Sequence, residues 1–206
     1  MVPDASPEHY FTARPATPAE LREIPVELAG RELTVTTAAG VFSGDRLDKG
    51  TAVLLPHLRP DAAATGDVLD LGCGWGPVAL SLALLRPRMR IWAVDVNERA
   101  LDLVRRNASR HDVSITARTP DTVPEDLRFT EIWSNPPIRI GKEALHALLR
   151  RWCPRLTPDG SAHLVVQKNL GADSLQAWIA AGGIEGISTV ERVDSAKGFR
   201  ILRLTH

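Results

Sequence analysis

The feature that most constrains the fold is the regular alternation, from residue 67 onward, of short β-prone runs with segments of helical length. We expect strands at residues 67–73, 90–96, 114–118, 129–135, 161–167, 187–193 and 199–205, and helices at 76–85, 98–111, 142–152 and 173–181. Strands and helices that alternate in this way predict an α/β fold with a mostly parallel, seven-stranded sheet and helices on both faces. Only a short turn, near residues 194–198, separates the last two runs, so the last strand is expected to be antiparallel.

The part of the chain ahead of this alternation has a different composition. Residues 1–25 are rich in proline among small and polar residues, which predicts an arm without regular structure. Residues 26–43 hold two β-prone runs divided by Gly30, so we expect a small β-hairpin there and a short amphipathic helix at 47–58. Because 206 residues that are 44% apolar suffice for one substantial core, a single domain is expected over residues 26–206, with 26–50 as its hairpin and connecting segment.

Composition excludes several functional classes. Cys73 and Cys153 occur without a CxxC pair or a Cys/His cluster, so neither a disulfide framework nor a metal site is indicated. The sequence has no signal-peptide pattern and no apolar stretch of membrane-spanning length, so we expect a cytoplasmic protein. The formal net charge is zero, unlike that of a dedicated nucleic-acid binder, but residues 1–135 are net acidic and residues 136–206 net basic. This asymmetry suits a solvated surface and also leaves room for a polyanionic substrate.

Ligands of open α/β sheets bind beyond the carboxyl ends of the strands, so the strand ends are where functional residues are expected. The first strand runs into DLGCGWGP, which contains Asp70, Gly72, Cys73, Gly74 and Gly76. Glycines at alternate positions let the backbone turn tightly and approach a ligand, and the following helix offers free N–H groups. A dinucleotide fingerprint would place glycine or alanine at position 77, where this chain has proline, so dinucleotide binding is disfavoured.

Two later strand ends each add a polar residue. Asp95 follows the second strand, where a carboxylate can accept hydrogen bonds from ribose hydroxyls, although on its own it would equally suit a helix N-terminus. The run through Asn135, Pro136 and Pro137 offers a side-chain carbonyl and a backbone carbonyl, while the two prolines contribute no N–H. Such an acceptor-rich edge, held by restricted backbone, suits an exocyclic amino group; the alternative is a turn that merely ends the strand.

These segments, together with GVFSGDRLDKGT at residues 40–51 and NPPIRIGKEALH at residues 135–146, resemble the class I S-adenosylmethionine-dependent methyltransferases. More specifically, they are similar to the methyltransferase small domain family, which includes ribosomal RNA guanine-2-amino methyltransferases. The resemblance extends from about residue 26 to the C-terminus. It implies a Rossmann-like fold, S-adenosylmethionine as cofactor, and Asn135, Pro136 and Pro137 as the catalytic segment.

The resemblance also implies which residues surround the cofactor. They are Asp70, Gly72, Cys73, Gly74 and Gly76 around its methionine part, Asp95 at the ribose, Val96 and Asn97 beside the adenine, Asp121 as the nearest acid for the adenine amino group, and Asp48, Gly50 and Thr51 from the segment ahead of the first strand. Judged from the residues alone, Asp48 is equally suited to capping a short helix.

Six residues are candidates for the substrate side: Phe42, Ser43, Ile138, Arg139, Lys142 and Phe199. Ile138 stands where many related enzymes have an aromatic residue, so a planar base would meet apolar packing there. Arg139 and Lys142 suit a nearby phosphate or simply solvent. Phe199 suits stacking on a base or a place in the core.

The leading hypothesis is therefore methylation of an amino nitrogen, most specifically the 2-amino group of a guanine in ribosomal RNA. We expect RNA as the partner, bound through the basic C-terminal half or recognised within a ribosomal subunit. Two alternatives stay open, a protein glutamine or small-molecule N-methyltransferase, and an inactive cofactor-binding module that serves as an RNA or protein scaffold.

Overall fold

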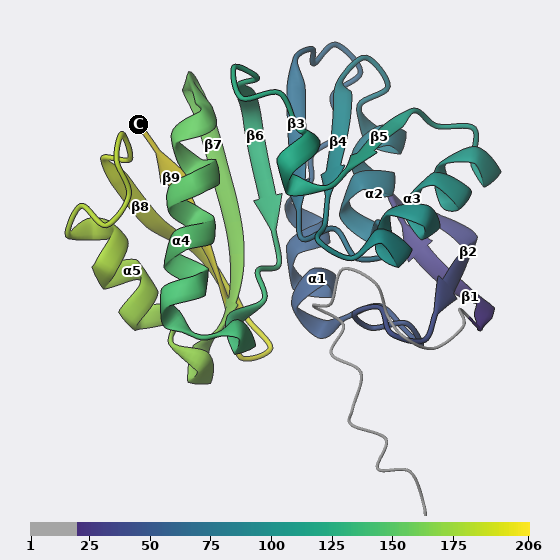
Figure 1. Ribbon diagram of the computed structural model, residues 1–206, viewed down its shortest axis with the longest axis horizontal. Coiled ribbons are helices and arrows are strands. Elements are labelled where there is room, and N and C mark those ends of the chain that lie inside the picture. Colours follow the sequence, from purple (N-terminus) through teal and green to yellow (C-terminus); the bar gives the residue numbers. More distant parts are fainter. Residues whose placement is uncertain (1–19) are drawn as a thin grey trace, which may run out of the picture.

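Seven strands within residues 20–206, the part of the chain that the computed structural model describes, form one sheet (Figure 1). They are β3 Asp67–Leu71, β4 Arg90–Val94, β5 Ile115–Arg118, β6 Phe129–Ser134, β7 Leu156–Gln167, β8 Thr189–Ala196 and β9 Phe199–Thr205. Their order is β5-β4-β3-β6-β7-β9-β8, with β3 to β7 parallel and β9 antiparallel to both of its neighbours. The expected α/β fold, mostly parallel with an antiparallel last strand, is confirmed.

Helices cover both faces of this sheet (Figure 1). α1 Lys49–Leu54, α2 Pro77–Leu85 and α3 Glu98–Arg110 lie on one face, and α4 Lys142–Trp152 and α5 Ala172–Ala180 lie on the other. Alternation along the strands supplies a core on each side, because Val68 packs with α1 to α3 whereas its neighbour Leu69 packs with α4 and α5. Short 3₁₀ turns at Leu55–His57, Pro120–Thr122, Ile138–Ile140, Cys153–Arg155 and Lys168–Leu170 join these elements.

The expected hairpin is present as β1 Leu21–Leu28 and β2 Arg31–Ala38, which pair antiparallel. Its inner side chains, such as Leu28 and Val35, pack on α2 and α3 and form a third core cluster. The predicted boundary at residue 26 was wrong, because β1 begins five positions earlier and includes Pro25. A two-stranded ribbon tolerates proline where the missing N–H would point away from the partner strand. The rest of the expected arm, up to residue 19, lies outside the described residues.

Two further boundaries differ from the prediction for identifiable reasons. β7 begins at Leu156 rather than at residue 161, because the turn-like TPDG run joins the strand through an irregular register opposite β6. β8 continues to Ala196, so the expected turn at residues 194–198 shrinks to Lys197 and Gly198, both with positive φ. Two residues in that conformation form the tight connection that matches the twist of a hairpin.

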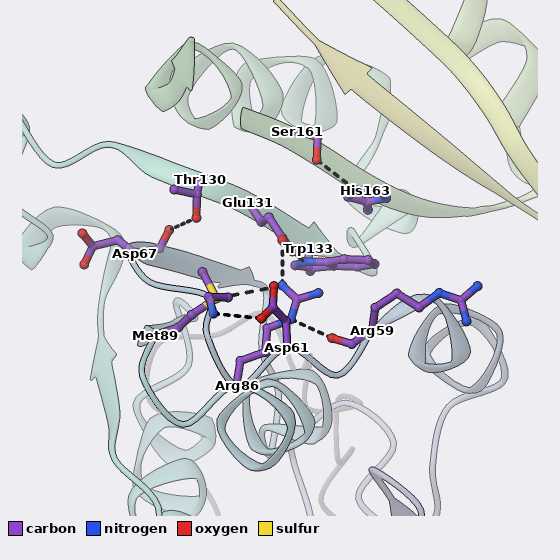
Figure 2. Close-up of polar contacts among 11 residues, drawn as sticks. Arg59, Asp61, Asp67, Arg86, Met89, Thr130, Glu131, Trp133, Ser161 and His163 are labelled. Carbon is purple, nitrogen blue, oxygen red and sulfur yellow. Dashed lines mark hydrogen bonds and ion pairs between the residues drawn. The ribbon is translucent and has the colours of Figure 1, made fainter. Parts of the chain in front are cut away.

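A polar cluster on the face covered by α1 and α2 ties the sheet to the end of α2 (Figure 2). The Glu131 carboxylate accepts hydrogen bonds from Arg86 (Nη1 to Oε1, 2.6 Å) and from the Trp133 indole (Nε1 to Oε2, 2.6 Å). Arg86 is buried and also donates through Nε to the Arg59 carbonyl (2.9 Å). Trp133 stacks on His163 of the neighbouring strand. Glu131 therefore serves the packing of α2 on β6.

No helix among residues 20–206 has the length and apolar character needed to cross a membrane.

Candidate active site at the carboxyl ends of the strands

The order of the strands reverses between β3 and β6, which is where ligands of such sheets bind. A cavity of about 310 Å³ lies there, a size typical of small-molecule sites. Part of its wall follows β3 and β4 and is formed by Gly72, Gly74, Asp95, Val96 and Asn97. Another part lies after β6, at the end of β7 and at the start of β9, and is formed by Asn135, Pro136, Pro137, Ile138, Gln167 and Phe199. Phe42 and Asp48, from the segment ahead of β3, also line it.

The glycine loop presents open backbone to this cavity. Gly72 has a φ of +74°, and the space where a Cβ would stand is empty. Beneath the loop, the buried Asp70 carboxylate accepts a hydrogen bond from the backbone N–H of Ala79 in the first turn of α2 (2.9 Å). Burial, helped by the nearby Asp95 carboxylate, raises the pKa of Asp70 to about 7, although the Ala79 N–H opposes this shift.

A second, small cavity of about 20 Å³ shares Gly72, Gly74 and Asn135 with the larger one. Asp70, Cys73, Thr51 and Ser43 are among its wall residues. The Cys73 side chain is buried, and this burial raises the pKa of its thiol well above the usual value, so the sulfur stays protonated. Cys73 therefore contributes packing under the loop.

Asp95 anchors the loop as well as lining the cavity. Its carboxylate accepts hydrogen bonds from the backbone N–H groups of Gly74 and Asn97 (both 2.9 Å). Burial raises the pKa of Asp95, while these N–H groups oppose the shift. Asn97 caps α3 by accepting from the Arg99 N–H (3.0 Å), and it donates to the Gly40 carbonyl (2.9 Å). Asn97 thus fixes the segment ahead of β3 against α3.

Asn135 is held by two acceptors. Its amide nitrogen donates to Asp48 Oδ2 (2.7 Å) and to Thr51 Oγ1 (3.1 Å). Asp48 also caps α1, which is one of the two roles its place in the sequence suits, by accepting from the backbone N–H groups of Gly50 (2.7 Å) and Thr51 (3.0 Å). An ionised carboxylate can only accept, so the nitrogen of Asn135 must face Asp48 and its oxygen must face the other way. No group among residues 20–206 donates a hydrogen bond to that Asn135 oxygen.

The two prolines form a tight turn beside Asn135. Pro136 offers its carbonyl, as the sequence suggests, but this oxygen already accepts a hydrogen bond from the Ile138 N–H (2.8 Å) around Pro137. A carbonyl oxygen has two lone pairs, so one remains for a ligand. The turn therefore orients the Pro136 carbonyl before any ligand binds.

Phe199 lies beside Gly50 of α1. A Cβ at Gly50 would stand 3.1 Å from the Phe199 ring and 3.2 Å from the Asn135 oxygen, so only glycine leaves both groups in place. Phe199 packs on the core, which is one of the two alternatives raised by the sequence, and it also lines the cavity. Three exposed large apolar residues, Phe42, Val96 and Leu170, border the same cavity.

Four of the candidate residues line neither cavity: Gly50, Gly76, Asp121 and Lys142. Asp121 does not line either cavity; its carboxylate pairs with Arg151 of α4 (2.8 Å), and its neighbour Pro120 lines the larger cavity instead. Lys142 is the exposed first residue of α4, outside the cavity wall. Arg139 lies in the turn at Ile138–Ile140, and its side chain is outside the described part of the chain.

Sequence reasoning missed Leu148, Leu170 and Gln167, which also line the cavity. Leu148 and Leu170 gave no signal, because an apolar residue in a helix or a turn is typical of a core. Gln167 could have been found, since it is the polar residue that ends β7 at the same edge of the sheet as Asn135.

Comparison with known proteins places these features in a family context. The model of the methyltransferase small domain family matches residues 32–203. YbxB of Bacillus subtilis, described as uncharacterized, is 32% identical over 95% of this chain and 97% of its own length. Ribosomal RNA small subunit methyltransferase C of Pseudomonas putida is 35% identical over 84% of this chain. That match covers 51% of the Pseudomonas protein, so this chain spans about half the length of that relative.

A solved structure shares the fold. The 16S rRNA N2 G1207 methyltransferase RsmC of T. thermophilus, in complex with AdoMet and guanosine, superposes with a TM-score of 0.78 at 23% identity. The superposition covers 91% of this chain and 51% of that protein. The order of the strands in the sheet therefore belongs to a methyltransferase-like fold.

Proposed function

The chain belongs to the methyltransferase small domain family, and on this premise we propose that it transfers the methyl group of S-adenosylmethionine to the exocyclic 2-amino group of a guanine in ribosomal RNA. The observation that carries this proposal is the Asn135 amide, whose nitrogen is held by Asp48 and Thr51 and whose oxygen is left free to accept. Relatives at 32% to 35% identity include a protein named as a small-subunit ribosomal RNA methyltransferase, which supports the choice of RNA.

The residues after β3 and β4 fit S-adenosylmethionine. The open space at Gly72 lets a ligand approach the backbone, and Asp95 retains lone pairs for ribose hydroxyls because each of its oxygens accepts one backbone hydrogen bond. Val94 and Ala100 give the adenine an apolar surface. The buried Asp70 carboxyl group lies under the loop that would hold the cationic methionine part.

When bound, the cofactor supplies an electrophilic methyl group on a positively charged sulfur. The chain's contribution is to position the acceptor nitrogen with its lone pair toward that methyl group. The Asn135 oxygen and the free lone pair of the Pro136 carbonyl accept the two N–H groups of an exocyclic amine. These two acceptors also stabilise the positive charge that develops on the nitrogen, which then gives one proton to water. No side-chain base is needed, because the sulfonium is already activated.

The approach to the cavity suits a polyanion. Lys49, Lys142, Lys168 and Lys197 are exposed on elements that border the cavity, and within residues 20–206 none of them forms an ion pair. Lys168 and Lys197 lie together, since the Lys168 N–H donates to the Gly198 carbonyl (2.8 Å). When such lysines bind phosphates, they release the counterions bound to the RNA. The affinity for RNA should therefore fall steeply as the salt concentration rises.

The proposal is tested by transfer of a labelled methyl group to separate pools of naked ribosomal RNA, isolated ribosomal subunits, transfer RNA, total protein and small molecules. Nucleoside analysis of labelled RNA should give a 2-methylguanine nucleoside. Label confined to protein or small molecules would overturn the RNA substrate, and bound cofactor without transfer to any pool would favour a scaffold.

A further inference from the structure

We propose that Gln167 is the specificity-determining residue that binds positions 1 and 6 of the target base. This inference rests on the proposed function, because it assigns a residue to the guanine that the function requires. Gln167 is the last residue of β7 and lines the cavity.

Strand pairing sets where the Gln167 side chain lies relative to Asn135. Trp133 of β6 is opposite His163 of β7, and side chains two residues apart on a strand point to the same face. Asn135, two residues after Trp133, and Gln167, four residues after His163, therefore share the face covered by α1. Gln167 lies about two residues further along than the position opposite Asn135, which is about 7 Å at the rise of a strand.

Phe199 completes the arrangement. It is directly opposite Gln167 in the antiparallel pair of β7 and β9, so the two side chains stand next to each other on that same face. Phe199 reaches Gly50 and thereby the edge of the Asn135 amide. The Phe199 ring thus has the Gln167 amide beside it and the Asn135 amide at its other edge. This arrangement fits a flat ligand with polar edges, such as a purine base.

The Gln167 amide has no hydrogen-bond partner in the part of the chain that the structure describes. It is half-buried, and no hydrogen bond joins its side chain to any other group among residues 20–206. Its cross-strand neighbour Phe199, which also lines the cavity, cannot form a side-chain hydrogen bond. An amide with two donors and an acceptor in the wall of a cavity loses hydration when a ligand binds, so a ligand that forms hydrogen bonds with it is favoured.

A guanine meets both amides along one edge. With its 2-amino group at Asn135, the adjacent N1–H faces onward along the sheet and can donate to the Gln167 oxygen, while O6 can accept from the Gln167 nitrogen. This two-bond contact requires groups at positions 1 and 6 of the base. A site built to form such bonds discriminates strongly against an analogue that lacks them.

The test compares guanosine with 2-aminopurine riboside, which keeps the 2-amino group but lacks both N1–H and O6. A free nucleoside is a workable probe, since the T. thermophilus structure holds guanosine. Protein saturated with S-adenosylhomocysteine is titrated with the fluorescent 2-aminopurine riboside and then with competing guanosine. We expect the wild-type protein to prefer guanosine by about tenfold or more. Gln167→Met, of similar size but without the amide, should reduce this preference to within about twofold and leave the affinity for S-adenosylhomocysteine unchanged.

Gln167→Glu is the second variant and keeps the size and polarity of the side chain. It should bind guanosine more weakly than Gln167→Met does, because its second carboxylate oxygen faces O6 and cannot donate. An unchanged preference in both variants, or no preference in the wild-type protein, would overturn the role of Gln167. If RNA still acquires labelled 2-methylguanine in that case, the proposed function stands; if no RNA is labelled, the function and this inference fail together.

Discussion

The carboxylate of Asp48 fixes which end of the Asn135 amide faces the cavity, through a 2.7 Å hydrogen bond between residues 87 positions apart in the sequence. The same carboxylate oxygen caps α1, so the position of Asp48 is set by the helix it begins. Capping and amide orientation are therefore coupled. The Asn135 amide is therefore held in one of its two orientations by the residue that caps α1 before substrate binds.

Replacing Asp48 by serine should separate its two roles. A serine oxygen still caps α1, but its side chain is too short to hold the Asn135 nitrogen. We expect a melting temperature close to that of the wild-type protein and a methyl-transfer rate about tenfold lower. A tenfold decrease corresponds to the free energy contributed by one charge-assisted hydrogen bond. Asp48→Ala is the matched control, because it should lose about 1 kcal/mol of stability as well as rate. Full activity of Asp48→Ser would show that Asn135 needs no such support.

Asn135→Ala and Asp95→Ala should affect different steps. Asn135→Ala removes an acceptor that acts on the amine, so single-turnover transfer should fall by about 100-fold or more while cofactor affinity changes by less than about twofold. Asp95→Ala should weaken cofactor binding first, since Asp95 holds the loop through Gly74. Calorimetric titration with S-adenosylmethionine and a single-turnover assay separate the two effects. Equal loss of cofactor affinity in both variants would contradict this division of roles.

The raised pKa of Asp70, about 7, predicts a pH dependence of cofactor binding. A cationic ligand favours ionised Asp70, so below pH 7 binding must release a proton and affinity should fall by up to about tenfold per pH unit. Asp70→Asn retains the acceptor for the Ala79 N–H and should flatten this dependence. Titration calorimetry in two buffers of different ionisation enthalpy measures the protons released. A wild-type pH profile as flat as that of the variant would refute the coupling.

The same pKa has a consequence for the protein without ligand. Between the ordinary Asp value of 3.8 and about 7, folded protein binds a proton at Asp70 that unfolded protein does not. The contribution of Asp70 to stability is therefore present at low pH and is lost as pH rises through this window. Cofactor should stabilise the protein more at pH 8 than at pH 6.

The Arg86 to Glu131 ion pair should matter for stability and not for ligand binding (Figure 2). Glu131→Gln leaves the nearly buried Arg86 without its charged partner and should lower the free energy of unfolding by about 2 to 3 kcal/mol, below the full value for a buried pair because Glu131 is partly exposed. Asp102→Asn, which breaks the exposed pair with Arg106, is the control and should cost less than about 0.5 kcal/mol. Urea unfolding measures both. Similar losses in the two variants would mean that burial adds nothing at Glu131.

The sequence was informative where local pattern determines structure. Parallel strands end at one edge of a sheet, so the strand-end residues Gly72, Asp95 and Asn135 could be expected to meet, and they line one cavity. The cap at Asp48 follows from its place before a short helix. Both predictions depend on residues close together in the sequence and on the regular alternation of strands and helices.

What could not be predicted depends on contacts between distant segments. Nothing near Asp121 in sequence shows that Arg151 of α4 pairs with its carboxylate at the surface. The bond from Asp48 to Asn135 and the contact of Phe199 with Gly50 depend on how α1 lies on the sheet. The β7 boundary was missed because its first residues have turn-like composition, and pairing with β6 overrides that local preference.

The most direct test of the central claim is mass spectrometry of nucleosides from small-subunit ribosomal RNA after incubation with deuterated-methyl S-adenosylmethionine. Wild-type protein and Asn135→Ala are compared at saturating cofactor. We predict labelled 2-methylguanosine with the wild-type protein and a reduction of about 100-fold or more with Asn135→Ala. Label in a different nucleoside, or equal amounts of labelled 2-methylguanosine from both proteins, would contradict the account.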